Sequence, residues 1–176
     1  QRIQLPAGAR IDAPQWAPDG KLVAFAMYHA DRIELWLADV VAARAWQIKG
    51  LQLNDTIGAA FQWMPDSQTL LCRAIPAGRE AAPTAPTAPP GPNVQESYGK
   101  PAPARTHQDL LKTPHDDARF EHYLTSQLVL VQATSGQQTR VGPPGLYSSV
   151  DPSPGGEYFL VSTLKKPFPR LLTVSG

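Results

Sequence analysis

The chain of 176 residues carries a formal net charge of +1, and hydrophobic residues make up 42% of it. This length suits one domain or one piece of a larger domain. The apolar content supports a packed core, which excludes a wholly disordered chain. The near-zero net charge gives no electrostatic reason to expect a nucleic acid or an anionic membrane surface as a partner.

The single cysteine and the start of the chain set further limits. Cys72 has no second cysteine to pair with, so an internal disulfide is excluded, and we interpret it as a small buried hydrophobic residue rather than a reactive thiol. The first residues include neither an initiating Met nor an apolar core of signal-peptide type. The longest apolar run, 22–28, is far shorter than the roughly 20 residues that span a bilayer. We therefore expect an internal excerpt or a processed product, without a membrane segment.

One six-residue motif occurs twice in the sequence and a third time in altered form. The three copies read Gln15-Trp16-Ala17-Pro18-Asp19-Gly20, Gln62-Trp63-Met64-Pro65-Asp66-Ser67 and Asp151-Pro152-Ser153-Pro154-Gly155-Gly156. Each copy places a Pro-Asp-Gly-like turn between a short segment and an apolar strand. A repeat of roughly 40 residues with this content predicts the blades of a β-propeller.

The predicted strands follow one another in two sets of four. The first set is 13–16, 21–28, 33–39 and 44–48; the second is 59–63, 69–75, 126–133 and 138–141. We predict an all-β partial β-propeller with a first blade at 10–55, a second at 56–145 and the start of a third at 146–176. Two blades and part of a third cannot close a ring of four to eight.

The second blade is interrupted by an insertion, predicted at 79–123. Residues 81–92 are rich in Ala, Pro and Thr, which predicts an extended polyproline-type linker. Thr106 can cap one short helix. Thr113 can cap a second, with Pro114 at its first position and Asp116 and Asp117 in its first turn. Phe120, Tyr123 and Leu124 would share one face of that second helix, and we expect both helices to pack on the edge of the blade.

The repeated residues have a structural explanation. Asp19 and Asp66 occupy turn positions where a carboxylate bonds the turn backbone, which we favour over a role as catalytic carboxylates. The four tryptophans are interpreted as packing between blades rather than as a platform for stacking a ligand; they are Trp16, Trp36, Trp46 and Trp63. Ser67 in the second turn and Gly155 in the third depart from the repeat and leave the turn geometry open.

Two clusters of polar residues suggest binding sites as minor alternatives. His107, His115 and His122 lie among acidic residues, but their spacing matches no compact zinc motif, and a solvated amphipathic helix is the favoured interpretation. The cations along the insertion are interpreted as solvated, with an acidic partner or substrate as the alternative. These cations are Arg79, Lys100 and Arg105.

The insertion also carries a family resemblance. It is formed by Gly91-Pro92-Asn93-Val94-Gln95-Glu96-Ser97-Tyr98-Gly99-Lys100, by Arg105-Thr106-His107-Gln108-Asp109-Leu110-Leu111-Lys112, and by the run from Pro114 to Tyr123 that leads into Thr125-Ser126-Gln127-Leu128. With the TolB-like repeats, the chain from about Pro6 to Arg170 resembles the N-terminal propeller of the glutamyl endopeptidases. These form a branch of the prolyl oligopeptidase family of serine peptidases.

The resemblance implies a separate C-terminal α/β-hydrolase domain with a Ser-Asp-His triad. The 176 residues contain no Gly-x-Ser-x-Gly elbow, and none of the serines at 148, 149, 153 and 162 has an adjacent signature of a nucleophile. We therefore assign no catalytic, cofactor-binding or metal-binding residue here and expect no cofactor.

Two functions follow as expectations. In the first, the chain is the non-catalytic propeller segment of a serine peptidase that cleaves after Glu, and it gates access of peptide substrates to its own hydrolase domain. In the second, it belongs to a stand-alone TolB-like propeller that binds other proteins. From the resemblance and the Ala/Gln/Pro-rich composition we expect a bacterial parent protein that is periplasmic or secreted.

Overall fold

The computed structural model describes residues 3–85 and 111–168. The chain divides into two compact units, which are described separately. The first comprises Gln1–Arg79 with Leu124–Leu164, and the second comprises Glu80–Tyr123 with Lys165–Gly176. Among the described residues, no helix is long and apolar enough to cross a membrane.

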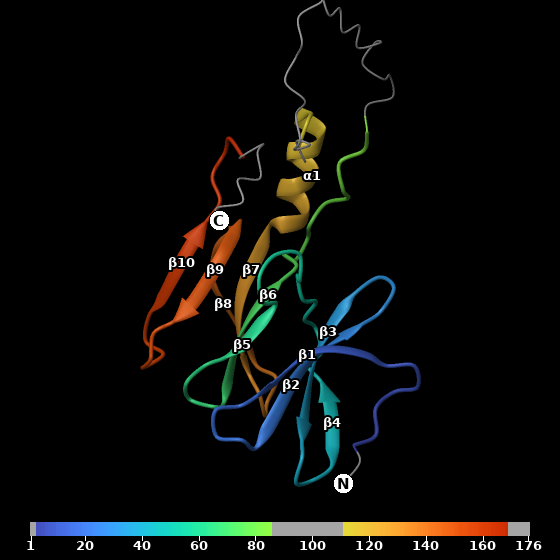
Figure 1. Ribbon diagram of the computed structural model, residues 1–176, viewed down its shortest axis with the longest axis vertical. Helices are drawn as coiled ribbons and strands as arrows, with labels where there is room; N and C mark the ends of the chain where they lie inside the picture. The colour runs from blue at the N-terminus through green and yellow to red at the C-terminus, as the bar shows by residue number, and fades with distance from the viewer. Residues whose placement is uncertain (1–2, 86–110, 169–176) are drawn as a thin grey trace, which may run out of the picture. The chain divides into compact units, whose positions relative to one another are not determined.

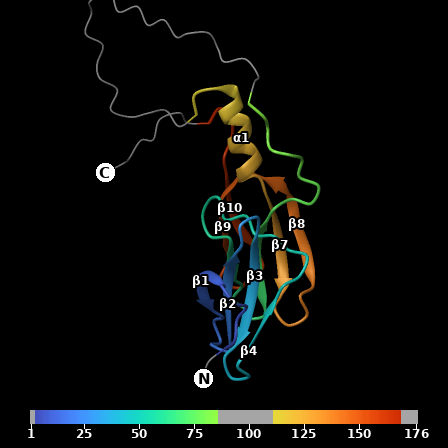
Figure 2. The same ribbon diagram turned by 90° about the vertical axis from the view of Figure 1, so that its right-hand side faces the viewer.

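The first unit contains three antiparallel sheets (Figures 1 and 2), which we call blades one, two and three. Blade one has the order β1 (Arg10–Trp16), β2 (Leu22–Tyr28), β3 (Ile33–Asp39), β4 (Arg44–Gln47). Blade two has the order β5 (Phe61–Trp63), β6 (Thr69–Ala74), β7 (Ser126–Gln132), β8 (Gln138–Gly145). In blade three, β9 (Tyr147–Pro152) pairs with β10 (Phe159–Thr163). The chain is therefore an all-β partial propeller, as the repeat predicts.

The strand boundaries differ from the prediction at two ends. β1 begins at Arg10 rather than at residue 13, because Arg10 pairs with Tyr28 across a bulge that lies between Asp12 and Gln15. β8 continues to Gly145 instead of ending at residue 141, although it contains Pro143 and Pro144. Proline is tolerated there because β8 is an edge strand of blade two and needs no hydrogen bond on its outer side.

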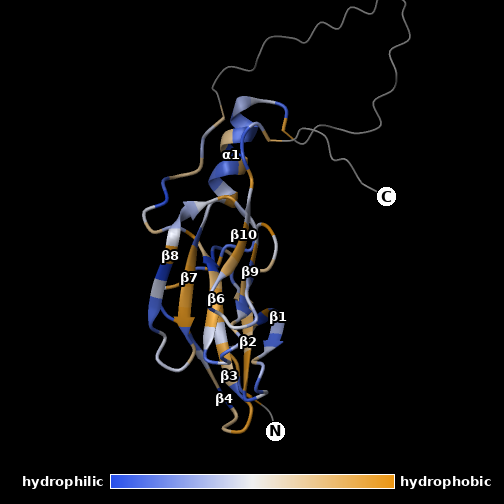
Figure 3. Ribbon diagram, turned by 90° about the vertical axis from the view of Figure 1, so that its left-hand side faces the viewer, coloured by the Kyte–Doolittle hydropathy of each residue, from blue (hydrophilic) through white to orange (hydrophobic). Residues whose placement is uncertain are grey.

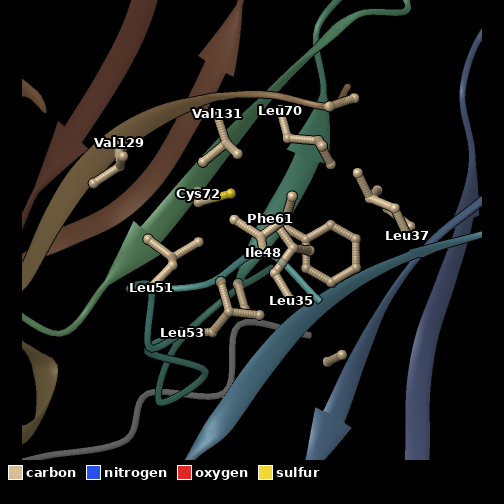
Figure 4. Packing of buried hydrophobic residues seen from close by; sticks show 14 of the residues in the cluster. Leu35, Leu37, Ile48, Leu51, Leu53, Phe61, Leu70, Cys72, Val129 and Val131 are labelled. Carbon is tan, nitrogen blue, oxygen red and sulfur yellow. The ribbon is translucent and has the colours of Figure 1, made fainter. Parts of the chain in front are cut away.

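Successive side chains of a strand point to opposite faces of its sheet. Two hydrophobic cores therefore form, one at each joint between blades. Leu70 and Cys72 of β6 lie in the core that blade two shares with blade one, whereas Leu71 lies in the core between blades two and three. Figure 4 shows the first core, where Leu35 and Leu37 of blade one meet Phe61 of blade two. All six residues of β6 are buried. Figure 3 shows its neighbour β7 as apolar beside the polar outer strand β8.

The three repeat turns share one geometry despite their different sequences. Gly20, Ser67 and Gly156 occupy the same turn position and have φ angles of 73°, 59° and 74°. Each donates its N–H to the carbonyl three residues earlier, at 2.8, 3.1 and 2.8 Å. The departures of Ser67 and Gly155 from the repeat therefore leave the turn unchanged. Ser67 holds the left-handed conformation that a glycine adopts without cost in the other two turns.

The second unit includes the helix α1 (Pro114–Leu124), which begins where the sequence predicts. Thr113 Oγ1 accepts the N–H of Asp116 at 3.2 Å, and Asp116 Oδ2 accepts the N–H of Thr113 at 2.9 Å, so the two residues cap the helix reciprocally. Phe120 lies 4.8 Å from Phe168, measured between ring centroids. The other helix, predicted to start at Thr106, falls at 106–110 outside the described residues. The packing of either helix on the blade edge stays a prediction.

Candidate functional site at the joints between blades

The joint between blades one and two is closed by a reciprocal pair of side chains. Gln15 on β1 donates its Nε2–H to the carbonyl of Phe61 on β5 at 3.3 Å. Trp63 on β5 donates its indole N–H back to the carbonyl of Gln15 at 3.1 Å. The repeated Gln-Trp pair is therefore an inter-blade connection, with Gln directed to the following blade and Trp to the preceding one.

The joint between blades two and three keeps the glutamine and loses the tryptophan. Gln62 donates to the carbonyl of Val150 on β9, as Gln15 does to Phe61. The third repeat, however, has Asp151-Pro152 in place of Gln-Trp, and proline has no side-chain donor to return. Instead, Arg73 on β6 adds a second bond from blade two to blade three by donating to the carbonyl of Ser148, and it also donates to the carbonyl of Ile57 before β5.

Arg73 is a buried charge, with 6% of its surface exposed. Burial lowers its pKa from the ordinary value, and the carboxylates of Asp151 and Asp55 act in the opposite direction. An arginine remains protonated under these conditions, so the joint contains a permanent cation that needs its carbonyl partners. A Cβ on Gly58 would lie 3.0 Å from Arg73 Nη1, and Gly58 has a φ of 64°. A side chain at position 58 would thus meet both a strained positive φ and the guanidinium, which favours glycine there.

A cavity of about 140 Å³ lies beside Arg73 in this joint. Its walls come from β5, β6, β7 and β9 together with the segment before β5. They comprise Gly58, Ala59, Gln62, Leu71, Arg73, Leu128, Ser148, Ser149, Val150 and Asp151. The joint between blades two and three thus contains both a buried cation and a cavity.

A second polar contact lies near the joint between blades one and two. The hydroxyl of Tyr28 at the end of β2 donates to Asp55 Oδ2. This hydrogen bond to a carboxylate, together with partial burial, raises the pKa of Tyr28 to about 12. Asp55 therefore influences both Tyr28 of blade one and Arg73 of blade two.

The turn carboxylates have the predicted structural role. Asp19 Oδ1 accepts the N–H of Lys21 at 3.1 Å, and Asp66 Oδ1 accepts the N–H of Thr69 at 2.8 Å. Cys72 is fully buried, and burial raises the pKa of its thiol, which confirms its interpretation as a hydrophobic residue.

The tryptophans fulfil the packing prediction only in part. Trp63 is 9% exposed in the core between blades one and two, and Trp46 is partly buried against the same core. Trp36 packs on the opposite face of blade one. Trp16 is 58% exposed. Within the described residues, neither Trp36 nor Trp16 packs between blades, so the prediction is wrong for both.

The minor alternatives gain no support from the described part of the chain. Among the described residues, no three His, Cys, Asp or Glu side chains come close enough to hold a metal ion. Three residues of the two clusters lie outside the described part of the chain: His107, Lys100 and Arg105. Ser148 and Ser149 belong to β9, where the carbonyl of Ser148 rather than its hydroxyl contacts Arg73.

Sequence reasoning missed the glutamines and Arg73. The signals were present: Gln precedes Trp in both intact repeats, and Arg73 is a lone charge in the apolar strand 69–75. In the third repeat, Asp151-Pro152 replaces Gln-Trp. This replacement indicated that the joint between blades two and three uses different contacts.

Comparison with known proteins agrees with this fold. No family model matches the sequence. A rice protein (Oryza sativa subsp. japonica) named as a probable chloroplastic glutamyl endopeptidase is 36% identical over 173 residues, which cover 93% of this chain and 18% of that protein. The chain therefore spans less than a fifth of the length of this curated relative.

Two solved structures share the fold at low sequence identity. TolB from Acinetobacter baumannii matches 90% of this chain and 28% of its own, with a TM-score of 0.50 and 14% identity. The acylaminoacyl peptidase of Pyrococcus horikoshii matches 91% of this chain and 22% of its own, with a TM-score of 0.51 and 16% identity. Over nearly all of its residues, the chain is thus similar to a segment of the glutamyl endopeptidases, and it shares its fold with parts of TolB and of an acylaminoacyl peptidase.

Proposed function

We propose that this chain is the non-catalytic propeller segment of a serine peptidase and restricts which peptides reach the catalytic domain. The observation that carries the proposal is the 36% identity to a glutamyl endopeptidase over 93% of the chain. In this proposal a hydrolase domain elsewhere in the polypeptide supplies the nucleophile, and peptide substrates are cleaved after Glu.

The proposed mechanism is steric. Blades held by buried cores and by side-chain bonds to main-chain carbonyls form a rigid wall, and a rigid wall excludes folded proteins while admitting short peptides. In the joint between blades two and three, Arg73 is a buried side chain that bonds the two blades beside a cavity, so its loss would loosen that joint. Substrate discrimination should therefore be most sensitive to changes in that joint.

The experiment uses the full-length protein, a fluorophosphonate probe, and two substrates with the same Glu-containing cleavage site. One substrate is a short peptide and the other is a folded protein carrying that site in a surface loop. We expect labelling by the probe and a strong preference for the short peptide. Arg73→Met, which loosens the joint, should raise kcat/KM for the folded substrate relative to the peptide. Arg140→Met on the exposed strand β8 should leave that ratio unchanged.

Specificity for Glu is tested separately from gating. Peptides that differ only by Glu, Gln or Asp before the scissile bond should be cleaved fastest with Glu, because a carboxylate at that position requires a cationic site of fixed depth. Equal cleavage of the Glu and Gln peptides would contradict the proposed specificity for Glu, but it would not contradict the proposed peptidase activity.

A stand-alone interaction module is the second candidate. The observation that favours it is the match of 90% of the chain to TolB. A full-length protein that neither labels with the probe nor cleaves any of the peptides would support this candidate over the first.

We also propose that the parent protein is exported, periplasmic or secreted, in a bacterium. The rice relative supports this proposal because it is named as chloroplastic, which is a location outside the cytosol. Cell fractionation followed by immunoblotting tests this, and recovery in the cytosolic fraction would contradict it.

A further inference from the structure

The guanidinium of Arg73 retains donors that its two hydrogen bonds do not use. It donates through Nη1 and Nη2 to the main-chain carbonyls of Ile57 and Ser148, whereas an arginine side chain has five N–H donors. Its Nε makes no hydrogen bond to the described residues. Every fully buried side-chain nitrogen and oxygen of those residues does have a partner. The Nε–H therefore reaches space that solvent can enter.

The cavity of about 140 Å³ that Arg73 lines has room for a ligand. A single water needs only about 10–15 Å³ of such space, so the cavity can hold a molecule of several heavy atoms. Gly58 and Ala59 line it and are both exposed, so they form its rim. A small molecule can thus enter the cavity from solvent.

Aliphatic side chains form much of the remaining wall. Leu71, Leu128 and Val150 line the cavity and belong to the buried core of the joint between blades two and three. A guanidinium bonds an anionic oxygen pair through parallel N–H donors, and an aliphatic wall covers hydrocarbon. The cavity therefore suits a ligand that has an anionic end and a short hydrocarbon part.

The carboxylates near Arg73 in the described part of the chain do not fill this position. Asp151 follows Val150 on β9, and successive side chains of a strand point to opposite faces. Val150 packs into the core of the joint, whereas Asp151 is exposed and pairs with Leu160, which is 73% exposed. The carboxylate of Asp55 bonds a tyrosine hydroxyl of blade one. Both carboxylates thus act on Arg73 through charge alone.

We propose that the cavity beside Arg73 is a binding site for a short aliphatic carboxylate. The carboxylate accepts parallel N–H bonds from the guanidinium, and the hydrocarbon part lies against Leu71, Leu128 and Val150. Free short-chain acids carry this chemistry, and so does the side chain of a glutamate within a peptide. Because the proposal concerns binding alone, it does not depend on peptidase activity.

Saturation-transfer NMR titrations of the full-length protein with propionate test the proposal at constant ionic strength. Propionamide is the matched neutral ligand and should show no transfer. Propionate should bind about fourfold more tightly than acetate, because burying one more methylene is worth about that factor. Absence of transfer to propionate, or equal transfer to propionamide, would overturn the proposal. Displacement of propionate by chloride at an equal concentration would also overturn it, in favour of a site for any anion.

Three variants place the signal at this cavity. Arg73→Met should abolish the binding of propionate. Since the loss of Arg73 also alters the joint, Ala59→Leu provides an independent test: it adds bulk at the exposed rim, leaves Arg73 in place and should also abolish binding. Arg140→Met, on the exposed strand β8, should bind propionate as the natural sequence does. Undiminished binding in Ala59→Leu or in folded Arg73→Met would overturn the proposal.

Competition identifies the source of the carboxylate. The amide of N-acetylglutamate carries the acidic side chain on a peptide-like backbone, and the amide of N-acetylglutamine is its neutral counterpart. Displacement of propionate by the glutamate compound alone supports the site and identifies a peptide side chain as its ligand. Displacement by neither compound, with propionate bound, supports a site for a free acid. Equal displacement by both compounds would show that the carboxylate is not recognised and would overturn the proposal.

Discussion

At the scale of single residues, Ser67 combines a conformational strain with a compensating contact. Its φ of 59° lies in the left-handed region, which costs a non-glycine residue roughly 1–2 kcal/mol. Its Oγ accepts the N–H of Asp19 from the turn of the preceding blade at 3.0 Å. The side chain therefore joins two turns, which explains how serine can occupy a glycine position.

Two substitutions separate these effects. Ser67→Ala removes the hydrogen bond and keeps the strain, so we expect the free energy of unfolding to fall by about 1 kcal/mol. Ser67→Gly removes the hydrogen bond and relieves the strain, so we expect the smaller change, within about 0.5 kcal/mol. Urea unfolding measures both, and a larger loss for Ser67→Gly than for Ser67→Ala would contradict the assignment.

Arg73 is the second residue whose replacement has a defined cost. Arg73→Met fills a similar volume but leaves the carbonyls of Ile57 and Ser148 without their donor, and an unsatisfied buried acceptor costs about 1–3 kcal/mol. We expect faster hydrogen exchange in β6 and β9. Arg140→Met, at an exposed position, should change stability by less than about 0.5 kcal/mol. Equal effects of the two substitutions would show that Arg73 does not hold the joint.

At the scale of elements, the start of α1 depends on the charge of Asp116. The hydrogen bond from the Thr113 hydroxyl, with those from the N–H groups of Lys112 and Thr113, lowers the pKa of Asp116 from its ordinary value. A lowered folded-state pKa means that the stabilisation is present above the unfolded pKa and disappears as the pH falls through the folded value.

We therefore expect the first turn of α1 to loosen as the pH falls below about 4, the ordinary pKa of an aspartate. Carbon chemical shifts of residues 114–117 measured between neutral and acidic pH report this change. Asp116→Asn should show the loosened turn already at neutral pH, and Thr113→Ser should retain the pH dependence of the natural sequence. A first turn in Asp116→Asn that is unchanged at neutral pH would exclude the proposed cap.

The elements that the sequence predicts well are those with local causes. The strand 33–39 and the helix from Pro114 follow from alternation and from capping chemistry, both of which are properties of neighbouring residues. The start of β1 at Arg10 and the end of β8 at Gly145 depend on pairing that continues past a bulge, with Arg10 opposite Tyr28 and Gly145 opposite Ser126, so local alternation misplaces them. The repeats predict the blades. The hydrogen bonds between blades could not be predicted, because they depend on where Gln15, Trp63 and Arg73 lie relative to the neighbouring blade.

At the scale of the whole molecule, the second blade is built from two stretches of sequence that are far apart. β6 ends at Ala74 and β7 begins at Ser126, yet the two strands pair along their full length, with Ala74 opposite Gln127. The strands β2 and β3 of blade one are joined by only the four residues 29–32. The same strand pairing is thus compatible with a short loop.

Replacing residues 80–123 by a four-residue turn should leave the three sheets intact. The loop between β6 and β7 would then shorten from 51 residues to 11. Because closing the longer loop costs about 1.4 kcal/mol more, the shortened protein should be the more stable one. Urea unfolding and the hydrogen exchange of β6 measure this. Loss of protection in β6 and β7 would mean that the removed segment is needed to hold the blade together.

The resemblance to the glutamyl endopeptidases could be found from the insertion, whereas the joint between blades could not be predicted from the sequence. Residues that bind through their main-chain carbonyls, such as Phe61 and Ser148, leave no mark in the sequence, because every residue type has that carbonyl. For Trp16, the residue type predicts a buried side chain, but the described residues leave its indole 58% exposed.

The separation of β6 from β7 also has a consequence in time. During synthesis the ribosome adds about 5–20 residues each second, so β6 waits some 3–10 s for its central partner. All six of its residues are buried in the finished blade, and Leu70, Leu71 and Cys72 form its apolar middle. For that interval the newborn protein presents an apolar strand that β5 covers on one edge alone. Slowing translation through the inserted segment should therefore increase aggregation, and a bound chaperone should prevent it.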